Sequence, residues 1–158
     1  MLGLFGKKNE IIAAPIAGEV VESARVPDPT FAEEMLGPAI AIKPSEGKVY
    51  SPVDGTITMI ADTGHAIALT SDKGTELLIH IGIDTVTLKG EPFTILAKDE
   101  QKVKVGDLLM EFDIKAITDA GLCAISPVIV TNGMGFKEVI RHTGQTVKAG
   151  DAVMEIKR

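Results

Sequence analysis

The stretch GHAIALTSDKGTELLIHIGIDTV, Gly64–Val86, decides the fold because two short apolar runs flank a turn sequence. Runs of this length, rich in Ile, Leu and Thr, are typical of paired β-strands. A two-residue loop at Asp72-Lys73 would place His65 directly opposite His80 on one face of a hairpin. A three-residue loop with a bulge at Gly74 would shift the pairing by one residue. The sequence leaves both registers open.

Two pairs of similar segments indicate that the chain contains a duplicated unit. The segments 15–18 and 52–55 share their proline and their glycine, and VKVGDLLMEF at 103–112 recurs as VKAGDAVMEI at 147–156 with six of ten residues identical. Each Pro-x-x-Gly is interpreted as a turn leading into a strand, and each Val-Lys-x-Gly-Asp as a tight turn between strands. We therefore expect a β-structure built from two related halves.

Sixteen glycines and eight prolines spread along the chain favour many short strands over a helical bundle. Only two stretches are predicted to be helical. The first, 28–37, has an N-cap aspartate, a proline at the first helical position and a terminal glycine. The second runs from Asp113 to Gly121. The prediction is an all-β sandwich or barrel with two small helices.

Length and composition favour one domain, 11–158, preceded by a flexible tail, 1–10. The formal charge of −6 argues against nucleic acid or an anionic membrane as a partner and suits a basic protein. The sequence contains no apolar run of about 18 residues, so it predicts no membrane span. At its start the lysines follow the apolar residues, which is the wrong order for a signal peptide. A single cysteine, Cys123, indicates a reducing cytoplasm and is predicted to be a small core residue. His142 is interpreted as an ordinary surface histidine.

The two hairpin histidines are the candidates for chemistry. Each could simply be a partly buried polar residue bonded to the backbone. However, Thr63 can hold one nitrogen of His65, Asp84 follows His80, and Gly82 permits close approach of another group. The sequence has no Gly-x-Ser-x-Gly elbow, Walker loop or zinc-hydrolase motif. Phosphoryl carriage fits better, because one neutral imidazole can attack phosphorus while its neighbour donates a hydrogen bond to the phosphoryl oxygens.

The run Gly64-His65-Ala66, continued by Gly74-x-Glu-Leu-Leu-Ile-His80-Ile-Gly-Ile-Asp-Thr-Val86, carries a resemblance to a known family. Shorter matches extend it over nearly the whole chain, from Ala14-Pro15-x-x-Gly18 to Val147-x-x-Gly150-Asp151. These motifs resemble enzyme IIA of the glucose class in the bacterial phosphoenolpyruvate:sugar phosphotransferase system. The resemblance implies a flattened β-barrel or sandwich with a duplicated hybrid motif and one or two short helices.

The resemblance also implies roles for the site residues. His80 would be phosphorylated on Nε2, His65 would serve mainly in passing the phosphoryl group on, and Thr63 would orient His65. No cofactor is implied, although His65 and His80 could be zinc ligands in complexes with other proteins.

The implied donor is the histidine phosphocarrier protein, and the implied acceptor is the cysteine of a sugar-specific IIB domain of a membrane permease. The chain would be a cytoplasmic monomer that meets the membrane only through this permease. By resemblance, the partners dock on an apolar ring with acidic residues at its rim, to which these residues correspond: Phe31, Met35, Leu36, Leu78 and Val86 in the ring, and Asp28 and Asp84 at the rim. Phe31 and Met35 could equally be core residues.

The main rival interpretation is a lipoyl- or biotinyl-type carrier domain, which shares hybrid β-topology. Lys73 at the tip of the hairpin would then be the modified residue, but the two histidines and Thr63 would have no role. Regulatory binding to other proteins is compatible with the same site and stays open beside sugar transport.

Overall fold

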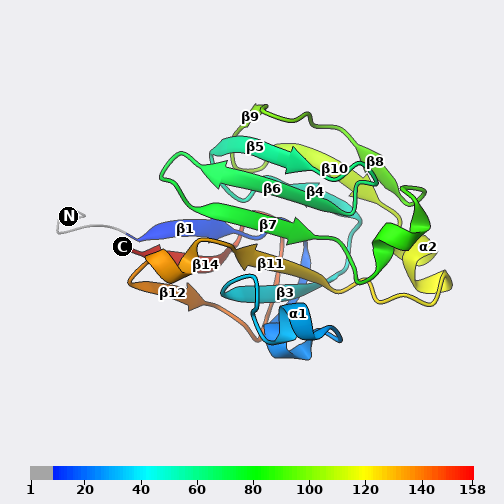
Figure 1. Cartoon of the computed structure of the whole chain (residues 1–158), viewed down its shortest axis with the longest axis horizontal. Helices are drawn as coiled ribbons and strands as arrows, with labels where there is room; N and C mark the ends of the chain where they lie inside the picture. Colours follow the sequence, from blue (N-terminus) through cyan, green and yellow to red (C-terminus); the bar gives the residue numbers. More distant parts are fainter. Residues whose placement is uncertain (1–8) are drawn as a thin grey trace.

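The computed structural model describes residues 9–158 and consists almost entirely of β-strands (Figure 1). The strands are β1 (Glu10–Ala13), β2 (Gly18–Glu22), β3 (Ala39–Pro44), β4 (Lys48–Tyr50), β5 (Gly55–Ile60), β6 (Ala66–Ser71), β7 (Glu76–His80), β8 (Phe93–Ile95), β9 (Lys102–Val103), β10 (Leu108–Phe112), β11 (Ser126–Val130), β12 (Glu138–Arg141), β13 (Gln145–Val147) and β14 (Ala152–Lys157). The helices are α1 (Pro29–Ala32) and α2 (Ile114–Asp119), with 3-10 turns η1 (Ser23–Arg25), η2 (Thr85–Leu88) and η3 (Gly133–Gly135). Residues 1–8 of the predicted tail lie outside the described part, and no helix within 9–158 is long and apolar enough to cross a membrane.

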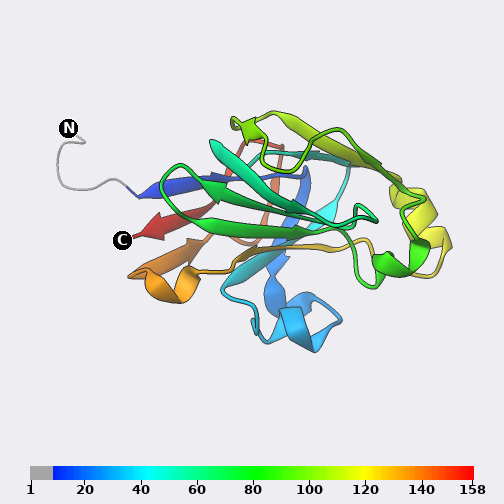
Figure 2. The same ribbon diagram turned by 45° about the horizontal axis from the view of Figure 1, so that its top comes forward.

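All the strand pairs are antiparallel, and they form one large sheet and two small ones. The large sheet has the order β13-β2-β3-β11-β7-β6-β5-β9, and the small sheets have the orders β1-β14-β12 and β4-β10-β8. Because the large sheet begins at β13 and ends at β9, the described strands form an open sandwich and not a closed barrel. Figures 1 and 2 show the start of β1 and the C-terminus at one end of this sandwich and α2 at the other.

The strand order confirms the predicted duplication and shows how the two halves are threaded. Read from its two edges, the large sheet is symmetric: β13, β2, β3 and β11 take the same places as β9, β5, β6 and β7. The small sheet β1-β14-β12 matches β4-β10-β8 in the same way. One half is therefore continuous in sequence, from β4 to β10, and is inserted in the chain between β3 and β11 of the other half.

The repeated sequence segments hold the two halves together through equivalent hydrogen bonds. The Ala13 amide donates to the Pro52 carbonyl at 3.0 Å, and the Tyr50 amide donates to the Pro15 carbonyl at 2.8 Å. In the two Val-Lys-x-Gly-Asp turns, an aspartate carboxylate accepts from the lysine amide three residues earlier, at 2.9 Å for both Asp107 and Asp151. The similar sequences thus occupy similar positions, as expected from their turn chemistry.

Alternating residues of β2, β3 and β11 pack on opposite faces of the large sheet, as the period of a strand requires. Ile40, Ile42 and Val128 point into the main core between the sheets. Their neighbours Ala39, Ala41 and Ile129 belong to a second cluster on the outer face, which also contains Phe31. The connection between β2 and β3 therefore covers this part of the outer face.

Both predicted helices exist, but the first is shorter than predicted. Asp28 caps α1 by accepting from the Thr30 amide at 2.9 Å, and Asp113 caps α2 by accepting from the Ala116 amide at 3.0 Å. Helix α1 ends at Ala32 and does not continue to Gly37. The physical reason is Glu34, whose φ of 54° lies in the left-handed region and cannot continue a right-handed helix.

Candidate active site around two histidines

The β6–β7 hairpin adopts the register that a three-residue loop requires. Ala66 lies opposite His80, and Thr70 lies opposite Glu76. The Ser71 amide donates to the Thr75 carbonyl at 2.8 Å, and Gly74 has a φ of 95°. Direct pairing of His65 with His80 is therefore wrong, because Asp72, Lys73 and Gly74 together form the loop.

His65 and His80 nevertheless meet, and the loop before β6 explains how. Their ring centroids are 5.3 Å apart at an interplanar angle of 73°. His65 precedes β6 and follows Gly64, whose φ of 78° turns the chain out of the regular strand path. The His65 carbonyl accepts from the Ile81 amide at 2.7 Å, so the backbone of His65 remains paired with the neighbouring strand while its ring lies against His80.

His80 ends β7 and is oriented by the backbone that follows it. Its Nδ1 lies 2.7 Å from the Gly82 carbonyl oxygen. A carbonyl oxygen can only accept a hydrogen bond, so Nδ1 carries the proton and Nε2 keeps its lone pair. The reactive nitrogen of this imidazole is therefore Nε2.

The loop that presents the Gly82 carbonyl is fixed by residues that sequence reasoning missed. Thr85 is fully buried, and its hydroxyl donates to the Ile81 carbonyl at 2.5 Å. The Gly82 amide donates to the Ser126 hydroxyl at 3.3 Å, and that hydroxyl donates to the Ala124 carbonyl at 3.0 Å. The motif contains Thr85 in sequence, but Ser126 comes from β11 and only the fold brings it here.

Thr63 stands behind His65 as predicted. Its Oγ1 lies 2.5 Å from Nδ1 of His65. A hydroxyl can donate or accept, so this contact is compatible with either neutral tautomer of His65. When the hydroxyl donates, the proton of His65 lies on Nε2 and is available to a ligand.

The surroundings keep both imidazoles neutral. Burial lowers the pKa of His80 below the ordinary histidine value, and the neighbouring charge of His65 acts in the same direction. The hydrogen bond to Gly82 and the negative charges of Asp28 and Asp84 oppose this shift of the His80 pKa. Burial also lowers the pKa of His65. Near neutral pH, His80 therefore has an unprotonated Nε2 available as a nucleophile.

The residues of the expected docking ring occupy two different environments. Phe31 is only 7% exposed and packs against His80, with 4.9 Å between the ring centroids and 50° between the planes. Met35 is 69% exposed, Leu36 and Val86 are also exposed, and Leu78 is partly buried. Phe31 thus contributes a wall to His80, while the other four leave apolar surface available.

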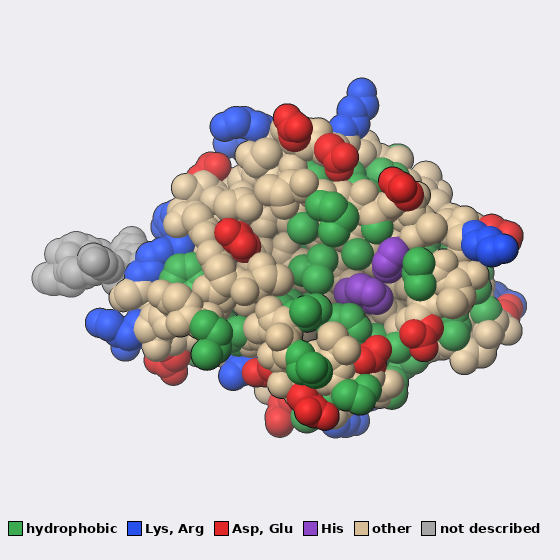
Figure 3. Space-filling view, in the orientation of Figure 1, with side chains coloured by type: hydrophobic (Ala, Val, Ile, Leu, Met, Phe, Trp, Pro, Cys, Tyr) green, Lys and Arg blue, Asp and Glu red, His purple; other side chains and the backbone are tan. Residues whose placement is uncertain are grey.

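The acidic residues of the expected rim lie close enough to His80 to influence its charge. Asp84 is exposed and Asp28 is half-buried. Figure 3 shows the two histidines among hydrophobic side chains on this face, with acidic side chains around them. The sequence did not single out Met59 and Ala68, which lie beside Leu78 across β5, β6 and β7 and continue the apolar face.

Cys123 differs from its prediction, and His142 has a partner that the sequence did not indicate. Cys123 is exposed and is not a core residue, because β11 and its buried run begin only at Ser126. The side chain of His142 is partly exposed, and its Nε2 lies 2.7 Å from a Glu155 carboxylate oxygen. This contact lowers the pKa of Glu155.

Comparison with known families agrees with this geometry. The sequence model of the phosphoenolpyruvate-dependent sugar phosphotransferase system, EIIA 1, matches residues 10–135. The chain belongs to the EIIA 1 family. It is a glucose-class IIA phosphoryl carrier, which acts through a phosphorylated histidine.

Relatives and a solved structure support the same assignment for this EIIA chain. It is 44% identical over 144 residues to the PTS system glucose-specific EIIA component of Oceanobacillus iheyensis, covering 91% of this chain and 87% of that protein. It is 46% identical over 153 residues to the PTS system beta-glucoside-specific EIIBCA component of Halalkalibacterium halodurans, covering 97% of this chain but only 24% of that protein. The glucose permease IIA from Mycoplasma capricolum superimposes with a TM-score of 0.86 at 34% identity, covering 94% of this chain and 96% of that one.

The comparisons do not favour the lipoyl- or biotinyl-type alternative for the EIIA chain. Lys73 lies in the loop at the other end of the hairpin from His80. Its carbonyl accepts from Arg158 at 2.8 Å, so the backbone of this tip has a structural contact of its own.

Proposed function

We propose that His80 of this EIIA chain accepts a phosphoryl group on Nε2 from the histidine phosphocarrier protein and passes it to the cysteine of a sugar-specific IIB domain. The observation that carries the proposal is the 2.7 Å contact between Nδ1 and the Gly82 carbonyl. This contact selects one tautomer before any partner arrives. The lowered pKa of His80 keeps its nucleophilic nitrogen free of a proton.

The two transfers balance without any further reactant. In the first, the Nε2 lone pair of His80 forms a bond to phosphorus while the phosphorus–nitrogen bond of the donor histidine breaks and its electron pair returns to that donor. The proton stays on Nδ1 of His80, and its hydrogen bond to the Gly82 carbonyl stabilises the ring as positive charge develops. In the second transfer, an acceptor thiolate bonds to phosphorus and the electron pair returns to Nε2.

We assign His65 the role of stabilising the phosphoryl oxygens. With its Nδ1 accepting from Thr63, His65 can donate from Nε2 to an oxygen of the group on His80. A neutral imidazole in this place offsets charge only by hydrogen bonding, and protonation would add full charge during transfer. This role would matter most when the phosphoryl group leaves His80 for the acceptor.

The partners are proposed from surface chemistry and from one relative. The exposed Met35, Leu36 and Val86 offer apolar contact beside the histidines, and Asp28 and Asp84 favour a basic partner. The name of the EIIBCA relative includes B and C components beside A, which supports a IIB domain as the acceptor. The apolar face would exclude water from the phosphorylated imidazole during transfer.

Zinc is proposed only for complexes. Within residues 9–158 there is no group of three or more His, Cys, Asp or Glu side chains placed to hold a metal ion. His65 and His80 could offer two imidazole nitrogens, and protein zinc sites use three or four ligands. A carboxylate or thiolate from a partner would have to complete the site. We propose no metal or other cofactor for phosphoryl transfer itself.

The proposal is tested by phosphorylating the chain with phosphoenolpyruvate, enzyme I and the phosphocarrier. One phosphate should appear on His80, and ³¹P NMR should identify the Nε2 isomer. His80→Ala should take up none, whereas His142→Ala is a matched control that should label like the wild type. Labelled His80→Ala, or an Nδ1 phosphohistidine in the wild type, would refute the assignment.

A further inference from the structure

The connection 23–38, between β2 and β3, carries two of the groups that surround His80. Phe31 packs its ring 4.9 Å from the imidazole, and Asp28 contributes negative charge to it. The connection leaves the large sheet after Glu22 and returns to it at Ala39. The position of Phe31 therefore depends on how this connection is held against the sheet.

One carboxylate ties the two ends of the connection 23–38 together. The Ser23 hydroxyl, at its start, donates to Glu34 Oε2 at 2.7 Å. The amide of Ala39, the first residue of β3, donates to the same oxygen at 3.2 Å. Glu34 itself has a φ of 54°, which directs its side chain back toward both ends. Without this carboxylate, the Ser23 hydroxyl and the Ala39 amide, at the ends of the two strands, would lose their partner.

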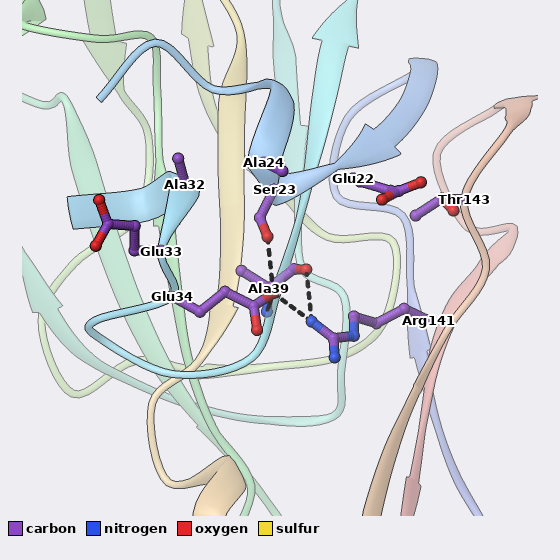
Figure 4. A pocket seen from close by; sticks show the side chains of 9 residues that line it. All are labelled: Glu22, Ser23, Ala24, Ala32, Glu33, Glu34, Ala39, Arg141 and Thr143. Atoms are coloured by element: carbon purple, nitrogen blue, oxygen red, sulfur yellow. Dashed lines mark hydrogen bonds and ion pairs between the residues drawn. The ribbon is translucent and has the colours of Figure 1, made fainter. Parts of the chain in front are cut away.

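A third partner comes from a different sheet. Arg141, the last residue of β12, forms an ion pair with the same Glu34 oxygen and lies 3.5 Å from the Ala39 carbonyl. Both side chains are partly shielded from water, which makes such a pair stronger than a fully exposed one. Figure 4 shows Ser23, Glu34 and Arg141 pointing toward one another from three segments, while Glu33 points away.

The hollow beside these residues has a volume of about 490 Å³ and is lined by the acidic side chains of Glu22, Glu33 and Glu34 together with Arg141. The guanidinium of Arg141 is already engaged by Glu34, so the hollow offers no free cation for an anionic ligand. The geometry favours a structural role for these residues over a ligand site.

We propose that Glu34 and Arg141 are positioning residues that hold the connection 23–38 against the sheet and thereby keep Phe31 packed on the phosphorylated imidazole. Neither residue touches the reacting atoms. Arg141 acts on Glu34, Glu34 fixes the connection, and the connection places Phe31 against His80. The inference rests on the proposed role of His80, which this device serves.

Four variants of the same chain separate positioning from charge and from folding. Glu34→Gln keeps the size of the side chain but removes the ion pair, and Arg141→Met removes the cation while leaving the bonds from Ser23 and Ala39. Glu33→Gln is the matched control, because it removes the same charge at the neighbouring position. The Glu33 side chain is exposed and has no hydrogen bond to the described residues. Arg141→Lys should rescue most of the effect, since lysine can still donate to Glu34.

The first measurement is the NMR signal of the His80 ring, which needs no phosphorylation. In Glu34→Gln the ring protons should lose their ring-current shift from Phe31, and the His80 pKa should rise toward the ordinary value as water enters. Phosphorylation at saturating phosphocarrier should slow by roughly tenfold, as expected for a misplaced group beside the reacting atom. Glu33→Gln should match the wild type in both assays.

Folded Glu34→Gln with wild-type His80 signals and rate would overturn the inference, as would equal losses in Glu33→Gln. If Glu34→Gln does not fold, Arg141→Met decides in the same way, because wild-type signals there would also overturn it. Phosphate on a residue other than His80 in the wild type would refute the proposed function instead. The His80 ring signals would still report on positioning in that case.

Discussion

Replacing Gly82 by alanine should disturb His80 through its backbone partner and leave the imidazole itself intact. Gly82 has a φ of 72°, in the region that L-residues avoid. A Cβ at this position would lie 2.6 Å from Cγ2 of Thr85 and 3.0 Å from the Cys123 carbonyl oxygen. Thr85 is fully buried and hydrogen-bonded, so it has little room to move. The loop must therefore shift, and the carbonyl that holds Nδ1 shifts with it.

The size of the effect follows from these contacts. The left-handed conformation costs about 1–2 kcal/mol for alanine, and a lost hydrogen bond costs about 1 kcal/mol more. We expect Gly82→Ala to lower the free energy of unfolding by about 2–3 kcal/mol. Loss of a hydrogen bond worth about 1 kcal/mol also lowers the ratio of the two neutral tautomers of His80 by roughly fivefold, against the one with a free Nε2. The phosphorylation rate should fall with the population of that tautomer, by up to about fivefold.

Gly74→Ala is the matched control, because Gly74 has a φ of 95° but nothing within 4 Å of the added Cβ. It lies at the far end of the same hairpin and should lose about 1–2 kcal/mol of stability with an unchanged phosphorylation rate. Urea unfolding gives the stabilities, ¹⁵N NMR gives the tautomer of His80, and initial rates with the phosphocarrier give the transfer. The reasoning fails if Gly82→Ala keeps the proton on Nδ1 and the wild-type rate.

Four further predictions concern the same site. His65→Gln should still accept phosphate on His80 but should deliver it to IIB at least about tenfold more slowly, and single-turnover transfer in both directions would expose any other division of labour. The lowered pKa of His80 predicts that phosphorylation persists as the pH falls below about 6.5, the ordinary histidine value; an acid limb at or above that value in the pH–rate profile would contradict this. The unfolding free energy should decrease as the pH falls through the same region, since the unfolded chain binds protons more readily, and His80→Gln should reduce this decrease. Thr85→Val should cost about 1–3 kcal/mol in urea unfolding because the Ile81 carbonyl loses its donor, and a neutral effect would mean that the 81–85 loop is held by other contacts.

The sequence predicted the duplicated fold well because its repeats have local causes. Asp107 and Asp151 close equivalent turns through their own backbone neighbours, so similar letters dictate similar geometry. The register of the β6–β7 hairpin was harder to predict, since the same residues are compatible with a two-residue and a three-residue loop. The pairing of Thr70 with Glu76 and the positive φ of Gly74 distinguish them in the structure, but glycine accepts either sign of φ, so the sequence does not.

The sequence predicted those site residues that belong to the local motif around the hairpin. His80, His65 and Thr63 lie within one hairpin and its approach, and the structure brings them together. Ser126 and Arg141 act from β11 and β12, and no spacing along the chain connects them to His80. The early end of α1 was missed for a related reason, because a glutamate in the left-handed region is retained by partners far away in sequence.

The symmetry of the sheet explains why the site lies beside β7. The strands β2 and β3 in one half correspond to β5 and β6 in the other, so their connections, 23–38 and 61–65, are equivalent. Each connection delivers one ring to the same imidazole: Phe31 at 4.9 Å from the first, and His65 at 5.3 Å from the second. The duplication thus provides two equivalent connections, and their different sequences place an apolar ring in one and a polar ring in the other. His80 lies between these two connections, so Phe31 can shield one side of its imidazole from water while His65 offers a hydrogen bond on the other.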